Sequence, residues 1–190
     1  MKNTTHYLFS LGLTNLYLLI EWGYDPILSR MLLVLSLLCS FISLMPNFLD
    51  QHVSTKYEYD GVQLPRYRHP LSHSPWTIAY FFPFLYLGEV TNMFFIQIIA
   101  SLMTISWLSH LFLDLLNPGG IPIGKGAIFN NHSIKHYQFM INNGNYKRLR
   151  LARIPFNDIK ANRNFSYFGL FLFSLNLATI FLTFLCGNSG

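Results

Sequence analysis

A histidine and an aspartate lie four residues apart at the end of a long apolar run. They are His110 and Asp114 in the segment SHLFLDLLNPGG, residues 109–120. Side chains at i and i+4 share one face of a helix, and imidazole with carboxylate suits Zn²⁺ or another divalent first-row metal. The spacing therefore predicts a metal-binding face, although the same pattern is also common in helices that bind no metal.

A second pair with the same spacing lies in the segment HPLSH, residues 69–73. Pro70 disfavours a helical conformation at His69. We therefore expect His73 to be the firmer metal ligand and His69 to be a ligand from a loop or a neighbour of the ligands. Solvated histidines are the alternative interpretation of this pair.

Other imidazole and carboxylate groups occur at the ends of apolar stretches. His6 begins the first stretch, and Asp50, followed closely by His52, ends the second. His132 and His136 also have ligand spacing, but they lie in a polar loop where solvated histidines are ordinary. The candidate metal ligands are His6, Asp50, His69, His73, His110 and Asp114. The candidate catalytic residues are Asp50, His73 and Asp114.

The elements that must position these groups are apolar. Hydrophobic residues make up 52% of the 190 residues and charged residues 11%, where about 25% charged is usual for a soluble domain. The apolar residues concentrate in five stretches, 7–20, 27–45, 76–87, 90–116 and 165–186. This pattern predicts an all-α integral membrane protein, a single-domain bundle of about five membrane helices.

The five stretches differ in length. A membrane-spanning helix needs about 20 residues, so the second, fourth and fifth stretches are the firmest candidates. The first and third are short, and they could be tilted, re-entrant or packed inside the bundle. The first could instead be a signal peptide, but the following Glu21-Trp22-Gly23-Tyr24 is a poor cleavage context, which favours a retained helix.

Lysine and arginine are unevenly distributed between the links. The polar region 117–164 is rich in both, so the positive-inside rule places it in the cytoplasm. If all five stretches cross the cell membrane, the N-terminus is also cytoplasmic and the C-terminus is outside. Of the 13 Lys and Arg residues, only Arg30 then lies near the outer face. We therefore interpret the net charge of +5 as a topology signal rather than as a nucleic-acid surface.

This topology brings all seven histidines to the cytoplasmic side, together with Asp50 and Asp114. The positive-inside rule explains such placement for cations but not for neutral histidines. The stretch 90–116 would form a helix of about 40 Å at ~1.5 Å per residue, against a hydrocarbon core of ~30 Å. The excess of about two turns would place His110 and Asp114 at the interface.

The cytoplasmic loop and the two cysteines carry weaker signals. The sequence Asn142-Asn143-Gly144-Asn145 predicts a tight turn, and residues 149–154 roughly alternate between apolar and basic. We expect either a small hairpin on the membrane surface or a disordered basic linker. Cys39 and Cys186 lack CxxC spacing and are expected to be buried, inert thiols.

Taken in order, these motifs resemble the YdjM-like family of membrane-bound metal-dependent hydrolases, also described as LexA-binding inner-membrane-associated proteins. The matching segments are Thr5-His6 with Gly12, Met45-Pro46-Asn47-Phe48-Leu49-Asp50, His69 with Ser72-His73-Ser74, and residues 109–120. The last segment, HxxxDxxxPGG, is the most specific. The resemblance covers residues 1–124 and implies a metal-site core there. The cytoplasmic loop 125–164 and a last membrane helix, 165–186, complete the single domain 1–190.

The sequence also departs from the family pattern. Asn47 stands where the family has its first aspartate, which leaves Asp50 to take that role with a one-residue shift. His69 lies four residues before His73 instead of five, and Arg68 precedes His69 where the family has an arginine after it. The resemblance therefore implies either a site with fewer metals or a degenerate site.

Residues and resemblance together predict a metal-dependent hydrolase at the cytoplasmic membrane face. The metal would be Zn²⁺, with Mn or Fe as alternatives, and it would activate a water molecule while Asp50 acts as base. Arg66, Arg68 and the basic cluster 147–153 would attract an anionic lipid or phosphoester substrate. The expected partners are the lipid bilayer and that substrate. The alternatives are an ion-binding transporter that uses the same His/Asp cluster and a non-enzymatic membrane interaction protein that uses the basic loop.

Overall fold

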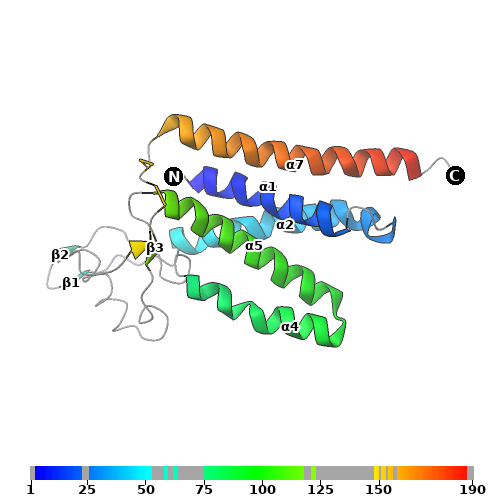
Figure 1. The fold of residues 1–190 in the computed structure, drawn as a ribbon, viewed down its shortest axis with the longest axis horizontal. Helices are drawn as coiled ribbons and strands as arrows, with labels where there is room; N and C mark the ends of the chain where they lie inside the picture. Colours follow the sequence, from blue (N-terminus) through cyan, green and yellow to red (C-terminus); the bar gives the residue numbers. More distant parts are fainter. Residues whose placement is uncertain are drawn as a thin grey trace.

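The described part of the chain folds mainly into helices, with four short strands (Figure 1). The computed structural model describes residues 3–22, 26–52, 58–59, 62–63, 75–117, 121–122, 148–149, 151–152, 154–155 and 158–187. The helices are α1 (Asn3–Trp22), α2 (Pro26–His52), the 3-10 helix η1 (Pro75–Tyr80), α4 (Phe82–Thr91), α5 (Phe94–Leu116) and α7 (Ile159–Gly187). The strands are β1 (Glu58–Tyr59), β2 (Val62–Gln63), β3 (Ile121–Pro122) and β4 (Arg148–Leu149). The all-α prediction is confirmed, because the strands that the structure describes are two residues long and form two small antiparallel pairs.

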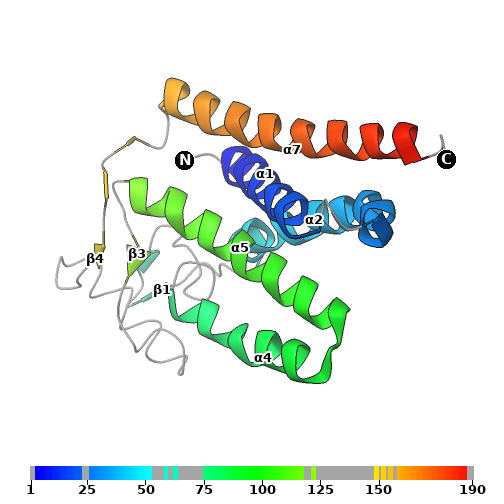
Figure 2. The same ribbon diagram turned by 45° about the vertical axis from the view of Figure 1, so that its right-hand side comes forward.

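Helix α1 lies at the centre of the bundle and packs against α2, α5 and α7. Successive helices run in alternating directions, and two views of the ribbon agree on this (Figures 1 and 2). The start of α1, the end of α2, the end of α5 and the start of α7 therefore lie at one end of the bundle. The segments that carry the polar motifs of α1, α2 and α5 meet at this end.

Helices α1 and α7 approach each other closely and touch through glycines. A Cβ atom added at Gly12 would lie 2.6 Å from the Cα atom of Gly169, and one added at Gly169 would lie 2.8 Å from the Cα atom of Phe9. Small residues let helix backbones approach in this way, as they commonly do in membrane bundles. The contact fixes α7 against α1 along the middle of both helices.

The fourth apolar stretch is divided by a turn, which corrects the predicted helix length. Helix α4 continues to Thr91, Asn92 adopts a left-handed conformation with φ of 52°, and α5 begins only at Phe94. Helix α5 has 23 residues, about 35 Å at ~1.5 Å per residue. Its excess over the hydrocarbon core is therefore about 5 Å instead of two full turns. The sequence hid this turn because Thr91 and Asn92 are uncharged polar residues in a run that contains others, such as Gln97, Ser101 and Thr104.

Two other predicted boundaries also change. The third stretch consists of η1 and α4, with Pro83 in the first turn of α4, where a missing N–H costs nothing. The last helix begins at Ile159 instead of residue 165. Asp158 caps its start by accepting a hydrogen bond of 2.8 Å from the backbone N–H of Ala161, so the polar first turns belong to the helix.

Within the described residues, two helices are long and apolar enough to cross a membrane, by length and composition. They cover Phe94–Leu116 and Ile159–Leu182. They correspond to the fourth and fifth predicted stretches. Cys39 on α2 is buried with a free thiol, as expected, whereas the side chain of Cys186 lies outside the described part of the structure.

The described parts of the polar loop attach to the end of α5. Strand β3 pairs with β4, so that Ile121 is opposite Leu149. The backbone N–H groups of Leu151 and Ile154 donate to the carbonyls of Leu115 and Leu116 at 2.9 and 2.8 Å. These bonds satisfy carbonyls that have no partner within the helix. The predicted Asn142–Asn145 turn lies outside the described residues.

Candidate functional site

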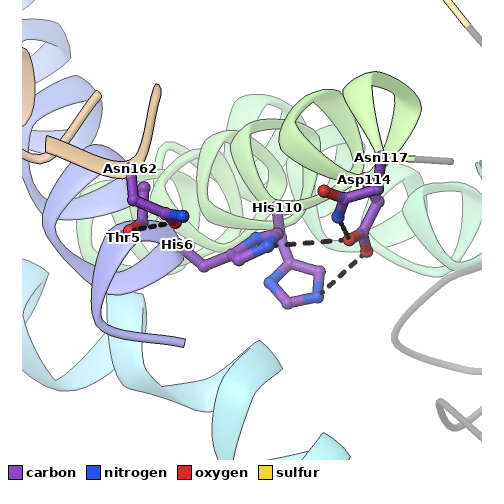
Figure 3. Close-up of polar contacts among 6 residues, drawn as sticks. All are labelled: Thr5, His6, His110, Asp114, Asn117 and Asn162. Atoms are coloured by element: carbon purple, nitrogen blue, oxygen red, sulfur yellow. Dashed lines mark hydrogen bonds and ion pairs between the residues drawn. The ribbon is translucent and has the colours of Figure 1, made fainter. Parts of the chain in front are cut away.

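Two imidazoles and a carboxylate meet at the polar end of the bundle (Figure 3). The Nε2 atom of His6 lies 3.6 Å from Oδ1 of Asp114, and the Nε2 atom of His110 lies 3.5 Å from Oδ2 of the same carboxylate. The two imidazole ring centres are 4.4 Å apart, with their planes tilted by 44°. The carboxylate is therefore approached by one imidazole from α1 and by one from α5.

The antiparallel packing of α1 against α5 creates this meeting. His6 is near the start of α1 and His110 is near the end of α5. One helical turn deeper in the bundle, Ser10 of α1 donates a hydrogen bond of 3.0 Å to Ser106 of α5. Residues four apart share one face of a helix, so each helix presents a polar stripe to the other. Asp114 extends the stripe of α5 by one more turn.

All three side chains are shielded from solvent. His6 and His110 are each 2% exposed, and Asp114 is 0% exposed. An ionised group buried in this way needs partners that offset the loss of hydration. The burial also changes the explanation for His110 and Asp114. Other protein groups surround this pair inside the bundle, whereas the sequence suggested a position at the membrane interface.

Two asparagines frame the three side chains. Asn117 donates through Nδ2 to Oδ1 of Asp114 at 3.0 Å. At the other side, Thr5 donates through its hydroxyl to Oδ1 of Asn162 at 2.8 Å, and Asn162 donates through Nδ2 to the carbonyl of Asp158 at 2.7 Å. The start of α7 is thereby fixed to the residue that precedes His6.

The pairwise distances are compatible with a shared divalent cation. Ligand bonds of about 2.0–2.2 Å at tetrahedral angles separate neighbouring donor atoms by about 3.4 Å, close to the two nitrogen–oxygen distances found here. Within the described residues, however, no three His, Cys, Asp or Glu side chains form a group that could hold a metal ion by themselves. A metal site built on His6, His110 and Asp114 would need further ligands from outside the described residues.

The structure brings together three of the six predicted ligands, His6, His110 and Asp114. The backbone of Asp50 lies in the last turn of α2, at the same end of the bundle, but its side chain is outside the described part. His69 and His73 fall outside the described residues. The same holds for the other polar-loop positions considered from the sequence, namely Arg66, Arg68, His132 and His136.

The middle of the bundle is also polar, which the sequence analysis missed. The hydroxyl of Ser106 donates a hydrogen bond of 3.2 Å to the carbonyl of Ile42. The hydroxyls of Thr14 and Ser43 are hydrogen-bonded to each other at 3.3 Å. Periodic Ser and Thr positions within the apolar runs were the available signal.

Deeper in the bundle, three helices meet at one amide. Asn15 of α1 accepts hydrogen bonds at Oδ1 from Ser36 of α2 at 2.6 Å and from Asn176 of α7 at 2.7 Å. Its own Nδ2 donates to the carbonyl of Leu11 at 2.9 Å. That last bond fixes the orientation of the amide, so Asn15 joins all three helices through one oxygen.

Comparisons with protein-family models, with curated proteins and with solved structures find no match for this chain. The resemblance to the YdjM-like family therefore stays a prediction based on the motifs.

Proposed function

We propose that the chain is a multi-pass membrane protein that carries a metal-dependent hydrolase site. The distribution of side chains supports the membrane setting. Large apolar side chains are exposed on several helices, including Phe41 at 71%, Phe84 at 55%, Phe95 at 59% and Phe171 at 61%. Serine, threonine and asparagine side chains are buried between the helices instead. Polar groups inside and aromatic groups outside suit a lipid environment.

The proposed orientation follows from the charge pattern. The end of the bundle that holds His6, His110 and Asp114 also holds the start of the basic segment leading into α7. With this end in the cytoplasm, the positive-inside rule is satisfied. The C-terminus of α7, at the opposite end of the ribbon (Figure 1), is then outside the cell.

The meeting of His6, His110 and Asp114 is the observation that carries the proposed activity. These three residues would supply part of the ligand set for Zn²⁺, or for Mn or Fe, and Asp50, His69 and His73 would complete it. Such a metal, when bound, lowers the pKa of a water molecule and polarises a scissile group. Direct binding of a metal by buried neutral imidazoles and a carboxylate is ordinary protein chemistry.

The residues of the chain itself have distinct tasks in this proposal. Asp114 supplies negative charge in a site that excludes water, where electrostatic interactions are strong. His6 and His110 hold the carboxylate between α1 and α5, so that the site exists only when both helices are packed. Where His69 and His73 complete the ligand set without it, the Asp50 carboxylate would accept the proton of the attacking water. The basic cluster 147–153 would attract an anionic substrate, such as a phospholipid or another amphiphilic phosphoester.

Hydrolysis of a phosphoester by the reconstituted protein tests this function. The purified chain in vesicles of anionic phospholipid, supplied with Zn²⁺ or Mn²⁺, should release a phosphate-containing product that ³¹P NMR detects. Asp114→Asn should abolish the release, because it removes the charge and keeps the shape. His132→Ala, in the polar loop, is the matched control and should keep it. Equal release by the wild type and by Asp114→Asn would contradict the proposed site.

The buried polar groups below the site favour one second candidate, an ion-binding transporter. Ser10, Thr14 and Asn15 continue from His6 into the bundle and form hydrogen bonds to other helices. These groups are hydroxyls and amides instead of the carboxylates and histidines typical of proton relays. Flux of Zn²⁺ or protons into vesicles that contain the protein, without phosphoester hydrolysis, would favour the transporter.

A further inference from the structure

Asn117 lies immediately after α5 and contacts the site carboxylate. Its backbone has φ of −77° and ψ of 153°, and its N–H donates to the carbonyl of Asp114 at 3.0 Å. A residue before proline is pushed towards such an extended conformation, and Pro118 follows. The sequence Asn-Pro therefore ends the helix and also directs the Asn117 side chain back over the last turn.

The side-chain bond of Asn117 selects one oxygen of the carboxylate. Nδ2 donates to Oδ1 of Asp114 at 3.0 Å, and Oδ1 is the atom that faces His6, whereas Oδ2 faces His110. Asn117 is 4% exposed, so little water competes for this bond. Donation to Oδ1 therefore restricts the rotation of the carboxylate about its Cβ–Cγ bond.

The two imidazoles depend on that rotation to different degrees. His110 and Asp114 are four residues apart on one helix, so the geometry of α5 already keeps them close. His6 comes from another helix, and its approach requires Oδ1 to point out of α5 towards α1. The contact between His6 and Asp114 is therefore the one that needs an additional group to orient the carboxylate.

We propose that Asn117 is a positioning residue that orients the Asp114 carboxylate towards His6. The proposal rests on the proposed function where it concerns metal affinity, because a hydrogen-bonded carboxylate is a better preorganised ligand. Partners that orient metal ligands typically change metal affinity by about 10- to 100-fold when they are lost. The orientation of His6 in the metal-free protein does not depend on the proposed function.

The test compares Asn117→Leu with Asn176→Leu in the full-length protein in detergent. Both substitutions remove a buried amide that donates one hydrogen bond to a side-chain oxygen, but only Asn117 touches Asp114. Binding of Zn²⁺ is measured with a competing chelator, and the Co²⁺-substituted protein gives an absorption spectrum that reports the ligand geometry. Asn117→Leu should weaken Zn²⁺ binding about 10- to 100-fold and alter the Co²⁺ spectrum, whereas Asn176→Leu should change neither.

A double variant shows whether Asn117 acts through His6. In a His6→Ala background, Asn117→Leu should weaken Zn²⁺ binding by less than about threefold. If Asn117 acts through the contact between His6 and Asp114, removing His6 already removes that contact, so the two effects are not additive. Equal effects of Asn117→Leu with and without His6 would overturn the proposal. Asn117→Ser provides the same comparison if the leucine variant does not fold.

The metal-free protein separates this inference from the proposed function. The ¹⁵N resonances of the His6 imidazole, assigned with His6→Ala, should shift in Asn117→Leu and stay unchanged in Asn176→Leu. A wild-type protein that binds no Zn²⁺ but shows this shift would refute the metal site and support the positioning role. Unchanged His6 resonances in Asn117→Leu would refute the positioning role, whether or not the protein binds metal.

Discussion

The Nε2 atom of His6 lies 3.6 Å from Oδ1 of Asp114, and this contact joins the first turn of α1 to the last turn of α5. Both residues are almost completely buried, so the contact forms only when the two helices pack against each other. Packing of α1 against α5 therefore creates this contact.

The Thr5–Asn162 hydrogen bond should stabilise the end of the bundle that holds the site. Asn162→Leu leaves a buried threonine hydroxyl without its acceptor, so the free energy of unfolding should fall by about 1–3 kcal/mol. A double-mutant cycle with Thr5→Val, measured by unfolding in mixed detergent, should give a coupling energy near 1 kcal/mol. Ser166→Ala is the control, because its hydroxyl lies 3.4 Å from that of Thr5 and contributes little. Additive effects of Thr5→Val and Asn162→Leu would show that this bond is not formed.

The glycine contact between α1 and α7 should tolerate no added methyl group. Helix propensity alone would make Gly12→Ala more stable by about 1 kcal/mol, but the new Cβ atom would lie 2.6 Å from backbone of Gly169. Overpacking costs about 1–3 kcal/mol, so the thermal unfolding temperature in detergent should fall. Ser174→Ala, on the exposed face of α7, gains propensity without a collision and should not lower it. A more stable Gly12→Ala protein would refute the close approach.

The amide of Asn15 should matter more than either of its two partners. Asn15→Leu removes the acceptor used by both Ser36 and Asn176, and we expect a loss of about 1–2 kcal/mol in unfolding free energy. Ser36→Ala and Asn176→Leu each remove one of the two bonds, so each should cost less. The same unfolding assay in mixed detergent measures all three variants. A smaller loss for Asn15→Leu than for Ser36→Ala would contradict the three-helix contact.

The proposed membrane orientation predicts which residues a membrane-impermeant thiol reagent reaches. Lys160→Cys lies at the end of the bundle that holds the site, and Glu89→Cys lies near the end of α4, at the opposite end; both positions are exposed. In a background with Cys39→Ala and Cys186→Ala, intact cells should label Glu89→Cys. Labelling of Lys160→Cys should occur only after the membranes have been opened. The reverse labelling pattern would invert the topology.

From the sequence alone, His6, His110 and Asp114 were expected at one face of the bundle, but the packing of α1 against α5 was not predicted. Alternating spans and one-sided placement of histidines leave few arrangements, and His6, His110 and Asp114 then share one end of the bundle. The start of α5 was wrong, since the apolar run continues through the turn at Asn92 and hides it. Hydrophobicity reports burial or lipid contact, and it does not report where a backbone changes direction.

The asparagines around the site could not be assigned from the sequence. Asn162 accepts a hydrogen bond from Thr5, which is 157 residues away in the sequence. No local sequence pattern connects two residues so far apart. Asn117 could be recognised as a helix stop because Pro118 follows it, but the direction of its amide depends on the packed position of Asp114. Short polar side chains inside apolar runs have several possible partners, and only the folded bundle selects among them.

The metal content of the purified protein tests the central claim most directly. Wild-type protein, prepared in detergent with Zn²⁺ present and then freed of loosely bound metal, should retain Zn²⁺ near stoichiometric amounts by elemental analysis. A His110→Ala, Asp114→Ala double variant should lose it, whereas a His132→Ala, His136→Ala double variant should keep it. Equal, substoichiometric Zn²⁺ in the wild type and in the His110→Ala, Asp114→Ala variant would contradict the proposed metal site.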